Sequence, residues 1–466
     1  MLYTYQDFEE AQDVPKFVLS AIERYKQSDM YQTACIADEY DKQRNTTITE
    51  TIPKVFNLAG MAVEDVTASN NKIPCNLFNR LNTQRCMYSL GNGISFVDPY
   101  EAAQGKSDTT KERLGKKFDH TIAEAGYYGL IHGVAYLFWD LDHAVTFKAT
   151  EFVPIEDEHD GSMRAGIRFW QLDTARPLNA VLYEKDGYTT FRQEDGRFTE
   201  TKQKTAYRVT YRYTEHDDEE TIDSEDNYPS IPVVRMYGSR LKQSTLVGMR
   251  SAIDAYDMIR SGFANDLQDC AQIYWIVENY GGMETSELRE FLNTLKFNHI
   301  ANADTQSGGK ITPYTQEIPT NARRECLTEL RDGIYEDYGA LDVHVISAGS
   351  TNDHIDAAYQ SLDENASDFE YWVSDAIINL LALQGIEDEP IFQRNKVSNK
   401  KEQVEMVVQE AEWLDEATVL RKLPNITPDE ASAILLAKDM EDAERMGYGN
   451  QGDDQENQEN EEEEEE

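Results

Sequence analysis

Apolar residues recur at helical spacing over one long stretch near the middle of the chain. Between residues 246 and 267 they stand three or four positions apart, which is the spacing of a single helix face. The stripe consists of Leu246, Met249, Ile253, Tyr256, Ile259, Phe263 and Leu267. Four aspartates lie off the stripe, namely Asp254, Asp257, Asp266 and Asp269. Apolar strand patterns stand on either side, at 231–234 and 273–278. The stretch therefore predicts a strand, a long amphipathic helix with one charged face, and a second strand.

The chain before this stretch divides into a helical opening and a β-rich middle. Helical spacing marks segments 18–25, 52–58, 77–88 and 111–122, and a buried strand is predicted at 134–139. Two Asp-Gly pairs, at 186–187 and 195–196, predict hairpin turns, and residues 207–213 alternate aromatic and polar side chains. We expect a curled antiparallel sheet here. The acidic stretch 215–227 has no apolar period, which predicts a mobile loop.

The chain after the long helix predicts a small α/β unit and then more helices. A short helix at 284–297 and a strand at 310–318 precede a second long helix at 321–338. Small and polar residues at 343–354 predict a loop, which leads into a long helix at 356–386. A further helix is predicted at 404–414, and residues 427–430 read as a capping box. From residue 447 the chain is polar and ends in six glutamates, so we expect it to stay extended.

The composition is that of a folded protein of several domains. With 466 residues, 40% of them hydrophobic, the chain is long enough for about three domains. No stretch approaches the roughly 20 apolar residues that cross a bilayer, and the N-terminus lacks the pattern of a signal peptide. Five widely spread cysteines without a C-x-x-C pair argue against a disulfide framework. We therefore expect a soluble, intracellular protein with no membrane association.

The net charge of -43 changes which partners can be expected. A protein that grips DNA tightly neutralises phosphates with clusters of Lys and Arg, and the sequence has no such cluster of sufficient size. The composition therefore argues against tight, sequence-specific DNA recognition. Strong acidity is equally consistent with keeping a concentrated protein soluble.

The sequence offers little support for catalysis. The nucleotide-binding pattern G-x-x-x-x-G-K-[ST] is absent, and so are G-x-S-x-G and any H-x-x-H spacing among the eight histidines. No cofactor is expected. The 87 acidic residues create many accidental carboxylate pairs of the kind that holds metal ions. A carboxylate- and metal-dependent nuclease or other DNA-processing enzyme therefore remains the alternative function.

Several segments along the chain together resemble a known family. They are NNKIPCNLFNRLNTQRCMYSLGNGISF, IHGVAYLFW, IPVVRMYG followed by IDAYDMI and NDLQD, and PIFQRNKVSNKKEQVEMVVQEAEWLDEATVLRKLPNITPDEA. In this order they resemble portal proteins of tailed bacteriophages, of the long-tailed (siphovirus) type. Two departures stand out. The segment ISAGSTNDHIDAAY is more polar than expected for the family's tunnel loop, and the short insertion at 273–318 implies a compact clip.

The resemblance implies an α+β portal fold, with a mostly helical wing, stem and crown, a β-rich wing layer and a small α/β clip. The implied parts are a wing at 1–240, stem helices at 241–270 and 321–342, a clip at 271–320, a tunnel loop at 343–355, a long helix towards the wing at 356–389, a crown at 390–446 and a disordered acidic tail at 447–466.

The same resemblance implies a structural protein, not an enzyme. Family members form a homo-oligomeric ring, a dodecamer, at one vertex of the capsid, after assembly in the host cytoplasm. Double-stranded DNA is packaged and ejected through the ring without recognition of its sequence. The implied protein partners are the terminase large subunit, the scaffolding and major capsid proteins, and a head-completion adaptor.

Two groups of residues are candidates for contact with DNA. The resemblance assigns the tunnel loop to Ser347, Ala348, Gly349, Ser350, Thr351, Asn352, Asp353 and His354. In the stem we expect some of Asp254, Asp257, Asp266 and Asp269 to face the channel, with Arg323, Arg324 and Arg331 as phosphate contacts or as ion-pair partners of a neighbouring subunit. The stem residues are equally consistent with solvated helix faces.

Overall fold

The computed structural model separates the chain into two compact units. It describes residues 2–56, 60–65, 68–98, 106–194, 197–214, 217–270, 274–278, 286–287, 289–290, 310–314, 319–342, 352–396, 400–423, 426, 431 and 433–438. The first unit comprises Met1–Tyr31, Thr83–Gln243 and Gly339–Glu466, and the second comprises Gln32–Asn82 and Ser244–Tyr338. Helices and strands occur in largely separate stretches of the sequence, which confirms the predicted α+β class.

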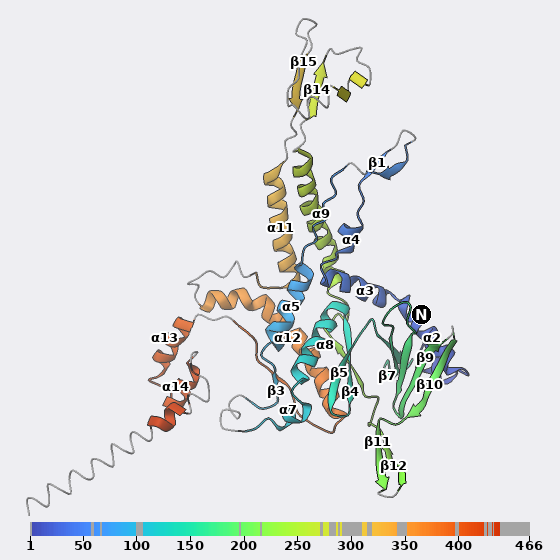
Figure 1. Cartoon of the computed structure of the whole chain (residues 1–466). Helices are drawn as coiled ribbons and strands as arrows, with labels where there is room; N and C mark the ends of the chain where they lie inside the picture. The colour runs from blue at the N-terminus through green and yellow to red at the C-terminus, as the bar shows by residue number, and fades with distance from the viewer. Residues whose placement is uncertain are drawn as a thin grey trace, which may run out of the picture. The chain divides into compact units, whose positions relative to one another are not determined.

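An antiparallel meander of five strands forms the larger sheet of the first unit (Figure 1). The strands are β6 (Phe152–Glu156), β7 (Met163–Trp170), β8 (Asn179–Glu184), β9 (Gly187–Glu194) and β10 (Arg197–Thr205). One face is covered by α2 (Val14–Lys26), which follows the short α1 (Tyr5–Glu9). Val18 and Ile22 of α2 are buried against Ile167 and other residues of this face. The predicted antiparallel sheet and the first predicted helix are therefore confirmed, but Arg208–Thr214, which were expected in the same sheet, form a strand of a separate two-stranded sheet.

A second sheet of three strands has the order β13-β4-β5. Its strands are β4 (Val134–Asp140), β5 (His143–Lys148) and β13 (Val233–Tyr237), and α8 (Phe118–His132) packs on it. Two glycines allow this close packing. A Cβ atom on Gly238 would lie 2.4 Å from the carbonyl carbon and oxygen of Gly129, so only glycine fits at position 238.

The acidic stretch 215–227 contains a strand, so the prediction of a loop is wrong there. Residues Asp217–Asp226 form β12, which pairs antiparallel with β11 (Arg208–Thr214) as a separate two-stranded sheet. Arg208 stands opposite Asp226 in this register, with 4.0 Å between guanidinium and carboxylate. This stretch has no apolar period, but pairing with β11 and the attraction between opposite charges stabilise it as a strand.

The remaining elements of the first unit are mainly helices. They are α7 (Thr109–Leu114), α12 (Asn352–Ala382), α13 (Lys400–Glu410) and α14 (Glu416–Lys422), with the short pair β3 (Ile94–Ser95) and β16 (Ile391–Phe392). The single helix predicted at 111–122 is two helices, because Gly115 with φ +80° ends α7 before α8 begins. Helix α14 was not predicted, and residues 427–430 and 447–466 lie outside the described residues.

The second unit contains the long helix predicted from the apolar stripe at residues 246–267. Its elements are α4 (Thr46–Glu50), the hairpin β1 (Lys54–Phe56) and β2 (Ala62–Glu64), α9 (Leu246–Cys270), the hairpin β14 (Tyr274–Glu278) and β15 (Lys310–Tyr314), and α11 (Thr320–Tyr338). Helices α3 (Asp29–Asp41) and α5 (Leu77–Leu90) contain the boundaries between the units. The helix predicted at 52–58 is wrong, since residues 54–56 are a strand.

Two predicted boundaries differ from the structure. The stem helix was placed from residue 241, but α9 begins at Leu246, after Lys242 takes the left-handed conformation with φ +52°. The predicted tunnel loop was extended to residue 355, but α12 begins at Asn352. Residues 343–351 lie outside the described residues.

Candidate functional site

Helices α9 and α11 run side by side in the second unit (Figure 1). The apolar stripe of α9 is buried at its beginning, where Leu246 and Ile253 are almost completely covered. On α11, Ile334 and Tyr338 are buried as well. Asp266 of α9 forms an ion pair with Arg323 of α11, whose guanidinium also lies 5.9 Å from the ring centre of Phe263. The pair of helices is thus held together within one chain.

A row of polar residues on α9 binds the segment between residues 40 and 75. We call this row the polar ladder; it consists of Asp254, Asp257, Ser261, Asn265 and Gln268. The residues stand three or four positions apart and therefore share one face of the helix. Each of them hydrogen-bonds to a residue between 40 and 75.

The first rung of the ladder is Asp254. One of its oxygens accepts a hydrogen bond from the hydroxyl of Tyr40, and the other accepts one from Thr47 Oγ1 at 2.7 Å. Arg250, one turn earlier on α9, lies 3.7 Å from the same carboxylate. Both oxygens of Asp254 are therefore engaged by α3, α4 and α9 itself.

The second rung, Asp257, is completely buried. Its carboxylate accepts hydrogen bonds from the side-chain amide of Asn45 and from the backbone N–H of Cys75, the latter at 2.8 Å. Burial raises the pKa of Asp257 above its usual range, against the effect of these two hydrogen bonds. Burial and the nearby carboxylate also raise the pKa of the Cys75 thiol to about 12. Since Asp257 has no exposed surface in the chain, it is not among the four candidate aspartates that can face a channel.

The remaining rungs bind an extended segment that runs antiparallel to α9. The backbone N–H of Ile73 donates to Ser261 Oγ at 3.1 Å, and that of Asn71 donates to Asn265 Oδ1 at 2.6 Å. The side chain of Asn71 also donates to Gln268 at 2.8 Å. Two extended residues span about 6.6 Å and four helical residues about 6 Å. Every second residue from 71 to 75 therefore meets the next turn of α9.

The exposed side of α11 carries a row of acidic residues. We call it the acidic row; it consists of Glu325, Glu329, Asp332 and Glu336, all exposed. Their spacing of four, three and four positions places the four carboxylates on one helix face. The sequence shows this spacing but does not distinguish it from that of other charged helix faces, so the row was not predicted.

The three candidate arginines of α11 differ in their surroundings. Arg323 is paired with Asp266, and Arg331 lies 3.4 Å from the Asp332 carboxylate and stacks 5.2 Å from the ring centre of Tyr335. Arg324 is exposed. The side chain of the fourth candidate aspartate, Asp269, lies outside the described residues.

Only the end of the candidate tunnel loop can be described. Residues Ser347, Ala348, Gly349, Ser350 and Thr351 lie outside the described residues. Asn352, Asp353 and His354 form the first turn of α12, and the side chains of Asp353 and His354 are exposed. An aspartate in this position favours the start of a helix, because it complements the positive end of the helix dipole.

Helix α12 is tied to the segment that leads towards the C-terminal helices. Asp356, Asp363 and Glu370 stand seven residues apart on α12, and Arg394 and Lys396 bind them. The guanidinium of Arg394 donates to Glu370 at 2.8 and 3.0 Å and to Asp363 at 3.1 Å. We call this set the ionic strap. Burial opposes ionisation of Asp363, yet a hydrogen bond from the Tyr88 hydroxyl and the two cations lower its pKa.

The described part of the chain contains neither a cluster of metal ligands nor a membrane-spanning helix. Within it, no three His, Cys, Asp or Glu side chains are grouped so as to hold a metal ion. None of the helices described here combines the length and apolar character needed to cross a membrane.

Comparison with known proteins identifies the class to which this arrangement belongs. A family model described as phage portal protein, SPP1 Gp6-like, matches residues 26–446. The chain therefore belongs to the portal protein family of bacteriophages, as its resemblance indicated.

Two named portal proteins are similar to the chain. That of Clostridium phage phiCD119 is 29% identical over 239 residues, which are 49% of this chain and 50% of that protein. That of Bacillus phage SPP1 is 20% identical over 326 residues, which are 67% of this chain and 61% of that protein. The matched segments thus span between half and two thirds of the relatives' own lengths.

Proposed function

We propose that the chain forms a ring-shaped channel at one vertex of a phage capsid, through which double-stranded DNA is packaged and ejected. Membership of the portal family supports this role, since the family is structural rather than catalytic. In this proposal the ring is a dodecamer of the virion that assembles in the host cytoplasm. It docks the terminase large subunit, the scaffolding and major capsid proteins, and the head-completion adaptor.

The acidic row of α11 is the observation that carries the proposal. Duplex DNA carries about one negative charge per 1.7 Å of its axis, so a basic wall would form many ion pairs that each step of translocation must break. A row of carboxylates repels phosphates instead. At physiological ionic strength this repulsion extends only about 8 Å, which centres a duplex without preventing its entry. We assign Glu325, Glu329, Asp332 and Glu336 to the channel wall.

The polar ladder complements this assignment by giving α9 a fixed position. A helix that lines a channel experiences force along its axis while DNA moves. Five rungs between α9 and the segment 40–75 oppose sliding of the helix, because a shift by one residue would break all of them at once. Exposed Arg324 remains a candidate for a phosphate contact, and so do the tunnel-loop residues Ser347–His354.

Charge reversal tests the assignment. Replacing all four residues of the acidic row with lysine is expected to leave rings intact by negative-stain microscopy. The altered rings should bind linear duplex DNA in a salt-dependent manner and reduce packaged DNA per head at least tenfold, because the wall now attracts phosphates. A matched variant carries lysine at four exposed acidic positions of the first unit, Glu9, Glu23, Glu200 and Glu225. Normal packaging by rings with the reversed α11 row would contradict the assignment.

A further inference from the structure

The loop between β7 and β8 is fixed in shape by its own hydrogen bonds. Gln171 Nε2 donates to the carbonyl oxygen of Arg176 at 2.8 Å, and the N–H of Arg176 donates to the carbonyl oxygen of Asp173 at 2.9 Å. At its end, Asn179 Nδ2 donates to the carbonyl oxygen of Pro177 at 3.2 Å. The loop therefore presents its side chains from a defined backbone.

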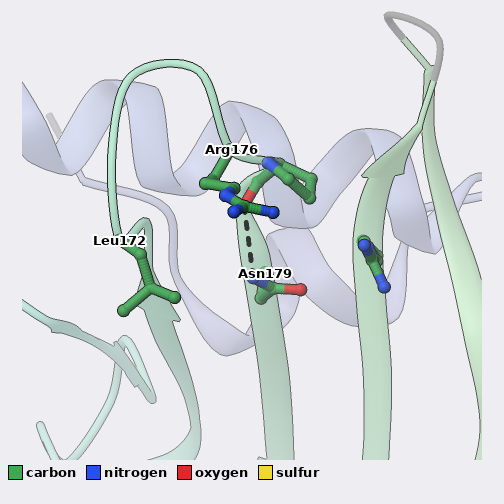
Figure 2. Close-up of a pocket in the computed structure, with 5 residues that line it drawn as sticks. Leu172, Arg176 and Asn179 are labelled. Carbon is green, nitrogen blue, oxygen red and sulfur yellow. Dashed lines mark hydrogen bonds between the residues drawn. The ribbon is translucent and has the colours of Figure 1, made fainter.

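An open hollow of about 390 Å³ lies beside this loop. Leu172, Arg176 and Pro177 of the loop line it together with Asn179 of β8 and Arg192 of β9 (Figure 2). Asn179 and Arg192 are directly opposite each other in the sheet register. A second hollow of about 450 Å³ shares Arg176 and Pro177 and adds Gln193 and Glu194. The two hollows form one continuous surface at this end of the five-stranded sheet.

Leu172 gives this surface an apolar contact point. The residue is 87% exposed, more than any other large hydrophobic residue in the described part of the chain. Removing a leucine side chain from water is favourable, and in the isolated chain Leu172 does not gain this stabilisation. Because the loop is held by hydrogen bonds, Leu172 cannot be covered without a partner or a rearrangement of the loop.

The charge of the surface is opposite to that of the whole protein. Two arginines, Arg176 and Arg192, line a hollow in a chain of net charge -43. Arg192 Nε lies 3.5 Å from the Glu194 carboxylate, and Arg176 has no carboxylate at ion-pair distance among the described residues. Guanidinium groups bind carboxylates in a two-pronged geometry, which makes this pair suited to acidic side chains.

We propose that this surface, formed by Leu172, Arg176, Pro177, Asn179 and Arg192, docks an acidic segment of another protein. The segment places carboxylates on the two arginines and a bulky apolar side chain against Leu172. Charge complementarity carries the choice of partner, since a basic or uncharged segment would leave the Arg176 guanidinium without a counter-ion and would offer Arg192 none besides Glu194. The proposal does not depend on the assignment of the channel wall.

Site-specific photo-crosslinking tests the proposal in infected cells that produce the full-length chain. Leu172 is replaced by a photoreactive phenylalanine analogue, and the crosslinked peptide is sequenced by mass spectrometry. We expect a peptide of a different protein that carries at least two Asp or Glu residues next to an apolar side chain. The double change Arg176→Glu with Arg192→Glu should reduce the yield of this product at least fivefold.

The control keeps the same change of charge on the same sheet. Lys185→Glu with Lys202→Glu alters two exposed residues outside the surface and should leave the yield unchanged. A crosslink to a second copy of this chain, to a basic or uncharged segment, or to nucleic acid would overturn the proposal. So would the absence of any product, or an equal loss of yield in both double variants.

Discussion

The buried carboxylate of Asp257 accepts the backbone N–H of Cys75 at 2.8 Å, which joins the middle of α9 to a segment 182 residues away in the sequence. Cys75 belongs to the extended stretch that precedes α5, and Asn45 donates to the same carboxylate from just before α4. One side chain therefore holds two separate parts of the second unit against α9.

Removing the Asp257 carboxylate should loosen the extended stretch before α5. In Asp257→Ala, the Cys75 N–H and the Asn45 amide stay buried but lose their hydrogen-bond acceptor. This loss should destabilise the contact between the segment and α9 by about 2 kcal/mol. By hydrogen–deuterium exchange, protection of residues 71–75 should fall about thirtyfold. Asp332→Asn, on the exposed row of α11, is the control and should leave this protection unchanged. Equal protection in both variants would show that the ladder does not hold this segment.

Asp257 and Asp363 should make opposite contributions to the pH dependence of the free energy of unfolding. The folded-state pKa of Asp257 is raised above the ordinary value of 3.8, so the folded chain takes up this proton first as the pH falls. Its contribution to the free energy of unfolding therefore increases as the pH falls through the folded pKa towards 3.8. The pKa of Asp363 is lowered, so its contribution is present above 3.8 and is lost as the pH falls through the folded value.

Denaturant midpoints of the wild type, Asp257→Asn and Asp363→Asn between pH 3 and pH 7 measure these contributions. The advantage of the wild type over Asp257→Asn should grow as the pH falls, and its advantage over Asp363→Asn should shrink. Two differences that change in the same direction would contradict the assigned environments.

Arg394 should control the segment between α12 and α13. Arg394→Ala removes the bidentate contact to Glu370 and the bond to Asp363, so exchange of residues 391–396 should rise about tenfold. Arg394→Lys keeps the positive charge but lacks the planar guanidinium group, so the exchange rate of residues 391–396 should be intermediate. The control Arg113→Ala replaces an exposed arginine of α7 and should leave the exchange of residues 391–396 unchanged. An unchanged exchange rate in Arg394→Ala would mean that the ionic strap contributes no order.

Two glycines should respond to alanine in opposite directions. In Gly238→Ala the new methyl group meets the backbone of Gly129 at 2.4 Å, and the melting temperature should fall, by an amount corresponding to about 1–3 kcal/mol. Gly333, inside α11, has open space around its Cβ position, so Gly333→Ala should raise the melting temperature by the equivalent of about 0.5–1 kcal/mol. A gain from Gly238→Ala would show that α8 and β13 are not in close contact.

Sequence reasoning could predict the elements whose residues form a local pattern. The stripe from Leu246 to Phe263 predicted α9, and the spacing of apolar residues at 321–338 predicted α11 within one residue of its start. Gly115 ends α7, but the apolar spacing continues through it to Phe118 and therefore predicted a single helix. The polar strand β12 was missed, because its order comes from pairing with β11.

The site itself depends on contacts that no local pattern encodes. Asp254 and Asp257 were predicted as charged residues of a free face, and both bind residues about 200 positions earlier in the chain. An aspartate on a helix has the same periodicity whether it meets water, a partner or a buried amide. The spacing of the acidic row of α11 can be seen in the sequence. Whether its side chains are exposed depends on how the unit folds.

Electron cryo-microscopy of the assembled protein at the capsid vertex tests the central claim most directly. The channel proposal predicts a ring with an axial hole wide enough for a DNA duplex, with Glu325, Glu329, Asp332 and Glu336 of every subunit facing that hole. A particle without an axial hole, or a ring in which these four carboxylates lie on the outer surface, would contradict it.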